Sequence, residues 1–161
     1  MPMPDQPSSS PTRPSDCYTC RQEVADHGTE RRERILATDR WRLVHSFDSA
    51  LEGWLVLLPR RHVVAIHDLT GEEAAELGPL LRRVSVALRD ELSCDKTYVI
   101  QLAEAEGFSH VHFHVVPRSA ELPTDRRGPG VFWYLRQPEE AWVSVDRQEE
   151  LATAIGRRLE A

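Results

Sequence analysis

Three histidines recur at every second position near the middle of the chain. His110, His112 and His114 alternate with bulky apolar residues. Because successive side chains of a β-strand point to opposite faces, this alternation predicts a strand over residues 110–117 with all three imidazoles on one face. An imidazole changes charge near neutral pH and can act as a nucleophile, a proton donor or a metal ligand. Aligned imidazoles pack no better than Thr or Val and repel one another when charged, so the pattern favours a chemical role. The side chains that this strand turns toward the core are Val111, Phe113 and Val115.

Two cysteines near the beginning of the chain form a second group of reactive side chains. Cys17 and Cys20 have the two-residue spacing with which paired thiolates bind one tetrahedral metal ion. A redox role would require a thioredoxin-like strand and helix, whereas the flanking sequence is rich in Pro and Ser before the pair and charged after it. Zinc needs two further ligands. From spacing alone, the candidates are His27, His45, His62, His67 and the three alternating histidines.

The composition limits the class of protein. A chain of 161 residues suits one domain. Residues 1–16 contain little that could be buried and are expected to be a disordered leader, which leaves residues 17–161 as the domain. The net charge is −6, with no basic stripe, which argues against polymeric nucleic acid as a partner. No apolar run approaches the roughly 20 residues that span a bilayer, and no secretory signal is evident, so we expect a cytoplasmic protein without a membrane partner.

Hydrophobic periodicity predicts an α+β fold around these side chains. Thr70 and Glu73 fit a capping box that opens a helix over residues 70–92, with a bend near Pro79. A second helix is expected over residues 146–159. The result is a mostly antiparallel sheet of about five strands, covered by one main helix and a C-terminal helix. Besides residues 110–117, the predicted strands are residues 40–47, 54–58, 96–102 and 131–135.

The histidine pattern also resembles that of a known family. Residues 110–116 match the His-x-His-x-His-x-x signature of the histidine-triad (HIT) superfamily, with x apolar, and Pro117-Arg118 follows. A Cys-x-x-Cys near the start and an apolar strand ending in Pro-basic-x-His, here residues 59–62, are similar to the zinc-containing bacterial members. The resemblance covers residues 17–118 and implies a HIT-like fold.

For the metal, the resemblance implies a closed set of four ligands. These are Cys17, Cys20, His62 and His110. A closed four-ligand site has no open position for a substrate, so the zinc implied by the resemblance is structural.

For catalysis, the resemblance implies a covalent mechanism at the α-phosphate of a nucleotide. His112 is the implied nucleophile, which forms a nucleotidyl-histidine intermediate. His114 is the implied partner, which hydrogen-bonds the phosphate or the bridging oxygen and assists the leaving group.

The substrate-binding residues follow less directly, because the chain departs from the family pattern here. Trp54 follows a glycine where many members carry a histidine, and the loop before the triad has two added glutamates, which disfavour a highly charged polyphosphate. Asp48 is the carboxylate nearest to the ribose-binding position, which aligns with Ser46, but a turn residue is an equally good interpretation. Gln101 and Gly107 are the candidates for phosphate binding.

Taken as a sequence, the chain is expected to be a nucleotide hydrolase or nucleotidyl transferase that acts on a nucleoside monophosphate ester, anhydride or phosphoramidate. The alternative is a zinc-stabilised nucleotide-binding module without turnover. A metal scaffold that uses all three histidines of the triad is less favoured. The resemblance also implies a homodimer, in which the aromatic segment 131–134 contributes to the contact or to the partner's pocket, or else belongs to the core.

Overall fold

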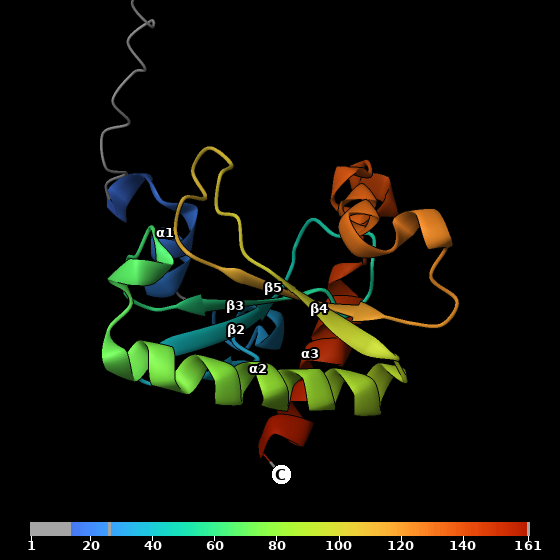
Figure 1. The fold of residues 1–161 in the computed structure, drawn as a ribbon, viewed down its shortest axis with the longest axis horizontal. Helices are drawn as coiled ribbons and strands as arrows, with labels where there is room; N and C mark the ends of the chain where they lie inside the picture. The colour runs from blue at the N-terminus through green and yellow to red at the C-terminus, as the bar shows by residue number, and fades with distance from the viewer. Residues whose placement is uncertain (1–13, 26, 161) are drawn as a thin grey trace, which may run out of the picture.

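The computed structural model describes residues 14–25 and 27–160. Its centre is a five-stranded antiparallel sheet with the strand order β1-β2-β3-β5-β4, which confirms the predicted α+β class (Figure 1). The predicted leader lies mostly outside the described residues, and Pro14–Asp16 form a short 3-10 helix, η1. The strands are β1 Leu36–Ala37, β2 Trp41–His45, β3 Leu55–Pro59, β4 Lys96–Ile100 and β5 Phe113–Arg118.

One predicted strand is wrong. Residues 131–135 lie within a 3-10 helix, η5 (Gly128–Arg136), and the fifth strand is instead the two-residue β1, which is too short to leave a sequence signal. Pro129 occupies the first turn of η5, where its missing N–H costs nothing. A Cβ at Gly130 would clash with the carbonyl oxygen of Asp125, so the chain is folded back too tightly here for an extended strand.

The main helix, α2 (Gly71–Leu92), covers one face of the sheet (Figure 1). The capping box of Thr70 and Glu73 is present, and the helix continues through Pro79. The C-terminal helix, α3 (Val145–Glu160), packs against α2 and contributes to the same core. The core side chains from α2, α3 and the sheet include Val84, Leu88, Leu151, Ile155, Leu43, Leu57 and Val115.

The opposite face of the sheet is covered by η5 and its neighbouring loops (Figure 1). A smaller cluster forms there around Trp54, Val116 and Val131, with Phe132 packed against it. β5 begins at Phe113, so His110 and His112 precede the strand instead of lying within it as predicted. The imidazoles of His112 and His114 line the pocket on this side of the sheet, whereas the apolar side chains that alternate with the histidines enter the core on the other side, as predicted. The intervening buried side chains are Val111, Phe113 and Val115.

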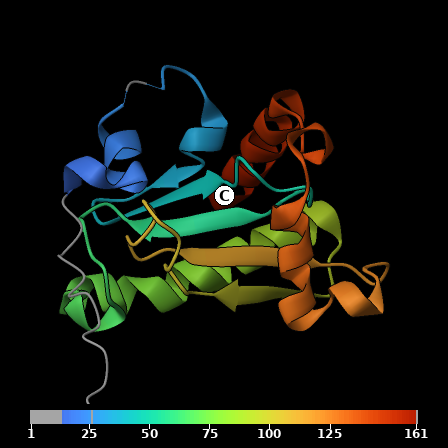
Figure 2. The same cartoon turned by 90° about the horizontal axis from the view of Figure 1, so that it is seen from above.

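A short helix, α1 (Tyr18–Val24), lies at the end of the sheet where the chain leaves β3 and enters β5 (Figure 2). Glu23 of α1 pairs with the guanidinium of buried Arg42, at 3.0 Å, and with that of Arg60, at 2.6 Å. These ion pairs hold α1 against the sheet. The other 3-10 helices are η2 Arg31–Glu33, η3 Ile66–Asp68, η4 Thr124–Arg126 and η6 Glu139–Ala141.

Within the described part of the chain, none of the helices combines the length and the apolar character needed to cross a membrane.

Candidate active site and metal centre

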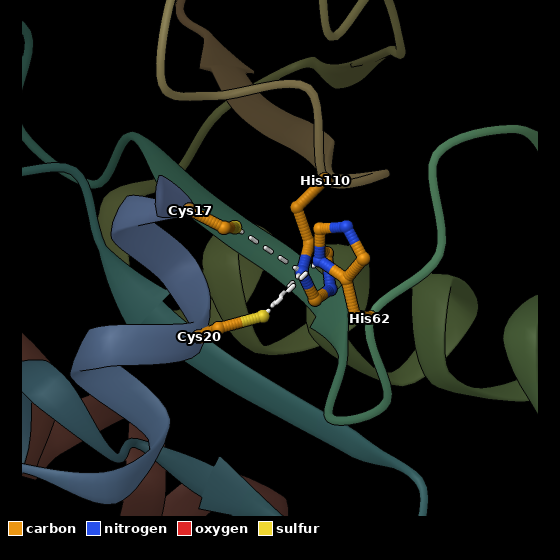
Figure 3. Close-up of side chains that lie close together, drawn as sticks. All are labelled: Cys17, Cys20, His62 and His110. Atoms are coloured by element: carbon orange, nitrogen blue, oxygen red, sulfur yellow. Dashed lines mark hydrogen bonds between the residues drawn. The ribbon is translucent and has the colours of Figure 1, made fainter. Parts of the chain in front are cut away.

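Four potential metal ligands meet at the end of the sheet. Cys17 precedes α1, Cys20 lies within it, His62 follows β3 and His110 precedes β5, and their side chains point toward one another (Figure 3). One ligand atom from each lies within 4.8 Å of all the others. Cys17 and His110 are fully buried. The fold thus brings together the four residues that the resemblance implied.

The distances in this cluster fit a tetrahedral ion. Ligand atoms around a zinc ion are roughly 3.3–3.8 Å apart, given Zn–S and Zn–N bonds of about 2.3 and 2.0 Å. The Nδ1 atom of His110 lies 3.7 Å from Sγ of Cys17 and 3.6 Å from Sγ of Cys20, and Cys20 lies 3.2 Å from Nδ1 of His62. The side chains can therefore bind zinc with little movement.

The protonation of His110 also suits a metal ligand. Its Nε2 lies 2.8 Å from the carbonyl oxygen of Pro59, and because a carbonyl can only accept, Nε2 donates and Nδ1 keeps its lone pair. Burial lowers the pKa of His110 to about 4, so the ring is neutral. Burial, followed by the neighbouring Cys17, raises the pKa of Cys20 to about 12. Metal binding would have to displace that proton.

A pocket of about 340 Å³ opens beside this cluster, on the face of the sheet opposite α2. His112 and His114 both line it, with ring centroids 4.9 Å apart and ring planes at 84°. The Nδ1 atom of His112 lies 2.7 Å from the carbonyl oxygen of His110. This nitrogen therefore donates, which leaves Nε2 of neutral His112 with the lone pair that a nucleophile needs.

His114 has a different partner. The indole Nε1 of Trp54 donates to its Nδ1 over 3.0 Å, and the two rings meet edge to face at 85°. Burial first, and then His112, lower the pKa of His114 to about 4. Trp54 is itself fully buried, at the position where the sequence departs from the family pattern.

An aromatic wall closes one side of the pocket. The ring of Tyr18 lies 5.4 Å from that of Phe47 and 5.0 Å from that of Phe108, measured between centroids. On another side, η5 contributes Phe132 and Leu135 to the lining. Aromatic faces of this kind bind flat, π-bearing groups such as nucleobases.

Only one of the three predicted substrate-binding residues lines the pocket. Asp48 lines the pocket, and the hydroxyl of Ser46, which also lines it, donates to its carboxylate over 2.8 Å. Gln101 and Gly107 lie in the adjoining connection but are not among the lining residues. The carbonyl of Gly107 accepts a hydrogen bond from the backbone N–H of Tyr18, at 3.0 Å.

Sequence reasoning missed several residues of the pocket. Tyr18 and Thr19 lie between the two cysteines, and Phe108 lies in the divergent loop. Phe132, predicted to belong to a dimer contact, to the partner's pocket or to the core, lines the pocket of its own chain and packs against the smaller core cluster. Their only local signal is aromatic character, which does not distinguish a pocket wall from a core.

The fold and the histidine arrangement define a class. The HIT domain family matches residues 28–121, more than half of the chain. The chain belongs to the HIT family.

Individual relatives agree with this assignment. The chain is 30% identical over 95 residues to adenosine 5'-monophosphoramidase hnt1 of Schizosaccharomyces pombe, covering 55% of this chain and 65% of the relative. It is 34% identical over 71 residues to bis(5'-adenosyl)-triphosphatase of Dictyostelium discoideum, covering 42% of this chain and 48% of the relative. The matches thus span about two thirds and half of the length of these curated relatives.

Solved structures share the fold. A histidine triad protein from Bradyrhizobium japonicum superposes with a TM-score of 0.65 at 25% identity, covering 78% of this chain and 89% of the other. A Zn-bound histidine triad family protein from Mycobacterium smegmatis superposes with a TM-score of 0.62 at 21% identity, covering 92% and 98%. The second likeness therefore includes most of the region beyond the family match.

Proposed function

We propose that the protein is a nucleotide hydrolase or nucleotidyl transferase that works through a nucleotidyl-histidine intermediate. The observation that carries this is the fixed orientation of His112, whose Nδ1 is engaged by the carbonyl of His110 while its ring lines the pocket. Nε2 then holds the free lone pair, and a second imidazole lies beside it. Both curated relatives carry names of nucleotide-cleaving enzymes, which supports the same activity.

In the first step, Nε2 of His112 attacks the α-phosphorus of the bound nucleotide. The N–P bond forms as the bond from phosphorus to the leaving group breaks. The leaving atom takes the electron pair and a proton from solvent, while Nε2–H of His114 donates a hydrogen bond to it or to a phosphate oxygen. In the second step, water or another acceptor attacks the same phosphorus while the P–N bond breaks and its electron pair returns to Nε2 of His112. The proton of the acceptor passes to solvent, and the nucleotide is released.

The charge of the pocket favours leaving groups that are small and uncharged or cationic. Asp48 and Glu104 are among the described residues that line the pocket, and these include no Lys or Arg. A polyphosphate would meet carboxylates without compensating cations. A phosphoramidate or a simple ester avoids that repulsion, and the monophosphoramidase relative is consistent with this preference.

For the sugar, the pair formed by Asp48 and Ser46 is the best-supported contact. Its carboxylate can accept hydrogen bonds from the ribose hydroxyls, and the Ser46 hydroxyl already orients it. Gln101 and Gly107 remain proposed phosphate contacts. Neither lines the pocket, so each would have to move toward it to bind the phosphate.

We assign zinc a structural role. Two thiolates and two imidazoles are a donor set that zinc prefers, and all four positions are filled by the protein. Bound there, the ion supplies a fixed cross-link between α1 and the start of the histidine segment. Zinc is also the ion bound in the structure from Mycobacterium smegmatis, whose likeness to this chain concerns the fold.

A homodimer and a cytoplasmic location belong to the same proposal. β4 is an edge strand of the sheet; Val99 within it is 47% exposed, and Leu102 just after it is 58% exposed. An edge strand with apolar side chains suits pairing with a second copy. Sedimentation equilibrium tests this, since a single species of monomer mass at micromolar concentration would contradict it.

The decisive experiment is intact-mass analysis after mixing the protein with an adenosine phosphoramidate and, separately, with a diadenosine polyphosphate. We expect an added adenylyl group on the wild-type chain, faster product release from the phosphoramidate, and neither result for His112→Ala. If the nucleotide raises the melting temperature without an adduct or a product, the protein is a binding module and the enzymatic proposal is wrong. His67→Gln, an exposed histidine away from the pocket, is the matched control that should keep full activity.

A further inference from the structure

The hydrogen bond between Trp54 and His114 connects the residue before β3 to β5, beside the pocket that His114 lines. Trp54 directly precedes β3, and His114 lies in β5, where it is paired with Val56 of β3. The ring of Phe132 lies 6.2 Å from that of Trp54 and 6.3 Å from that of His114, so the pair is packed on its outer side. The contact is built into the sheet and does not depend on a surface rotamer.

The chemistry of the indole determines which nitrogen of His114 carries the proton. An indole N–H can only donate, so the nitrogen that faces it must accept. Since Nδ1 of His114 faces Nε1 of Trp54 at 3.0 Å, the proton of the neutral ring lies on Nε2. The other tautomer and the imidazolium would both place an N–H against the indole N–H.

His112 has the opposite tautomer, because its Nδ1 donates to the carbonyl of His110. Two adjacent imidazoles of the pocket therefore differ at Nε2: His112 presents a lone pair and His114 presents an N–H. A nucleophile and a hydrogen-bond donor are both needed at a phosphoryl group, and a second lone pair in place of the donor would repel its oxygens.

We propose that Trp54 is a positioning residue that holds His114 neutral, in the Nε2–H tautomer and in the orientation that donates to the phosphate or the leaving group. The inference rests on the proposed function for its catalytic consequence, although the tautomer itself can be observed in the resting protein. The burial that lowers the pKa of His114 to about 4 acts in the same direction, because it keeps the ring uncharged.

The test compares Trp54→Phe with a matched variant, Trp41→Phe. Trp41 is also fully buried and also donates one indole hydrogen bond, to the carbonyl of Glu73 at 3.2 Å, but it lies outside the pocket. Both variants lose one donor and a similar ring volume. We expect Trp54→Phe to lower kcat about tenfold with KM within about twofold, and Trp41→Phe to lower the melting temperature while leaving kcat unchanged.

The second readout is the pair of ¹⁵N ring shifts of His114, assigned with His114→Gln. The wild type should show an unprotonated Nδ1 and a protonated Nε2, and Trp54→Phe should move both shifts toward the averaged values of an exchanging ring. A protonated Nδ1 in the wild type overturns the inference, as does an unchanged kcat in Trp54→Phe. If the wild type shows no turnover, the proposed function fails, and the ring shifts still decide whether Trp54 sets the tautomer.

Discussion

His110 and His112 lie two residues apart, yet their environments give them different chemistry. Each donates one hydrogen bond to a backbone carbonyl, but His110 uses Nε2 toward Pro59 and His112 uses Nδ1 toward His110. His110 therefore turns Nδ1 toward the two cysteines, and His112 keeps Nε2 for the pocket. The nitrogen left over by a backbone hydrogen bond, and not the residue type, therefore decides the role of an imidazole.

The two regions also share an element. Helix α1 follows Cys17 and contains Cys20, and its Tyr18 and Thr19 line the pocket. The four candidate metal ligands form one compact cluster, whereas the pocket is lined mainly by apolar and aromatic side chains, with Asp48 and Glu104 among them. Disturbing the metal should therefore change substrate binding through α1, while disturbing the pocket should leave the metal in place.

The largest expected effect separates the two histidines directly. His112→Ala should lower kcat by about 10³-fold or more, because the proposed nucleophile is removed. Its free energy of unfolding should change by less than about 1 kcal/mol, since the ring lines an open pocket. Steady-state kinetics and urea unfolding measure the two quantities.

His110→Ala provides the contrast on the same segment. It should lose bound metal and stability together, because His110 is fully buried between the cysteines and Pro59. Equal losses of stability in the two variants would contradict the division of roles.

The next effect concerns the metal centre. Cys20→Ser should abolish stoichiometric zinc binding and lower the free energy of unfolding by about 3 kcal/mol, because α1 loses its cross-link to the sheet. KM should rise as well, since Tyr18 is the first residue of α1 and lines the pocket. Metal analysis by mass spectrometry and thermal unfolding measure these changes. A chelator should lower the stability of the wild type to the same extent and leave that of Cys20→Ser unchanged. A wild type that keeps its stability after a chelator has removed its zinc would contradict the structural role.

The sequence predicted what depends on local patterns. The alternating histidines, the capping box at Thr70 and the helix over residues 70–92 follow from side-chain periodicity, and the structure confirms the buried partners and the helix. The strand predicted at residues 131–135 failed because a short apolar run fits a strand or a helical turn equally well.

In the candidate site, too, local patterns predicted some residues, whereas others depend on how distant segments fold together. Spacing alone identified Cys17 and Cys20 as a ligand pair but left the other ligands open, because they come from loops far apart in the chain. The resemblance supplied His62 and His110, and the fold then brought all four together. No pattern could have paired Tyr18 with Phe108 in one wall, since that contact depends on how α1 meets the loop before β5.

A third effect is the dependence of stability on pH. Burial holds the pKa of His114 at about 4 in the folded protein, against about 6.5 when unfolded. Between these pH values the unfolded chain therefore binds more protons than the folded protein. The free energy of unfolding is thus highest above pH 6.5 and decreases as the pH falls toward 4. At about 1.4 kcal/mol per pKa unit, and allowing for the open pocket, the loss is about 2 kcal/mol.

The wild type and His114→Gln should be compared by urea unfolding at pH 7 and pH 4.5. The variant should lose less stability between the two, because it has no ring to protonate at this position. Acid also releases zinc from its ligands, but that loss is common to both proteins and cancels in the difference. Identical pH profiles would show that His114 is not held neutral by the fold.

The smallest expected effect tests the link between metal centre and pocket from the pocket side. Tyr18→Leu removes a ring that contacts Phe47 and Phe108 but leaves the cysteines on either side unchanged. Loss of one stacking surface should raise KM up to about tenfold, or about 1.4 kcal/mol, with kcat and zinc content preserved. Tyr18→Phe is the matched control, because it keeps the aromatic face and should retain the wild-type KM. If Tyr18→Leu instead loses zinc, α1 depends on this packing to position Cys20, and the two regions are less separable than the contrast between His110 and His112 implies.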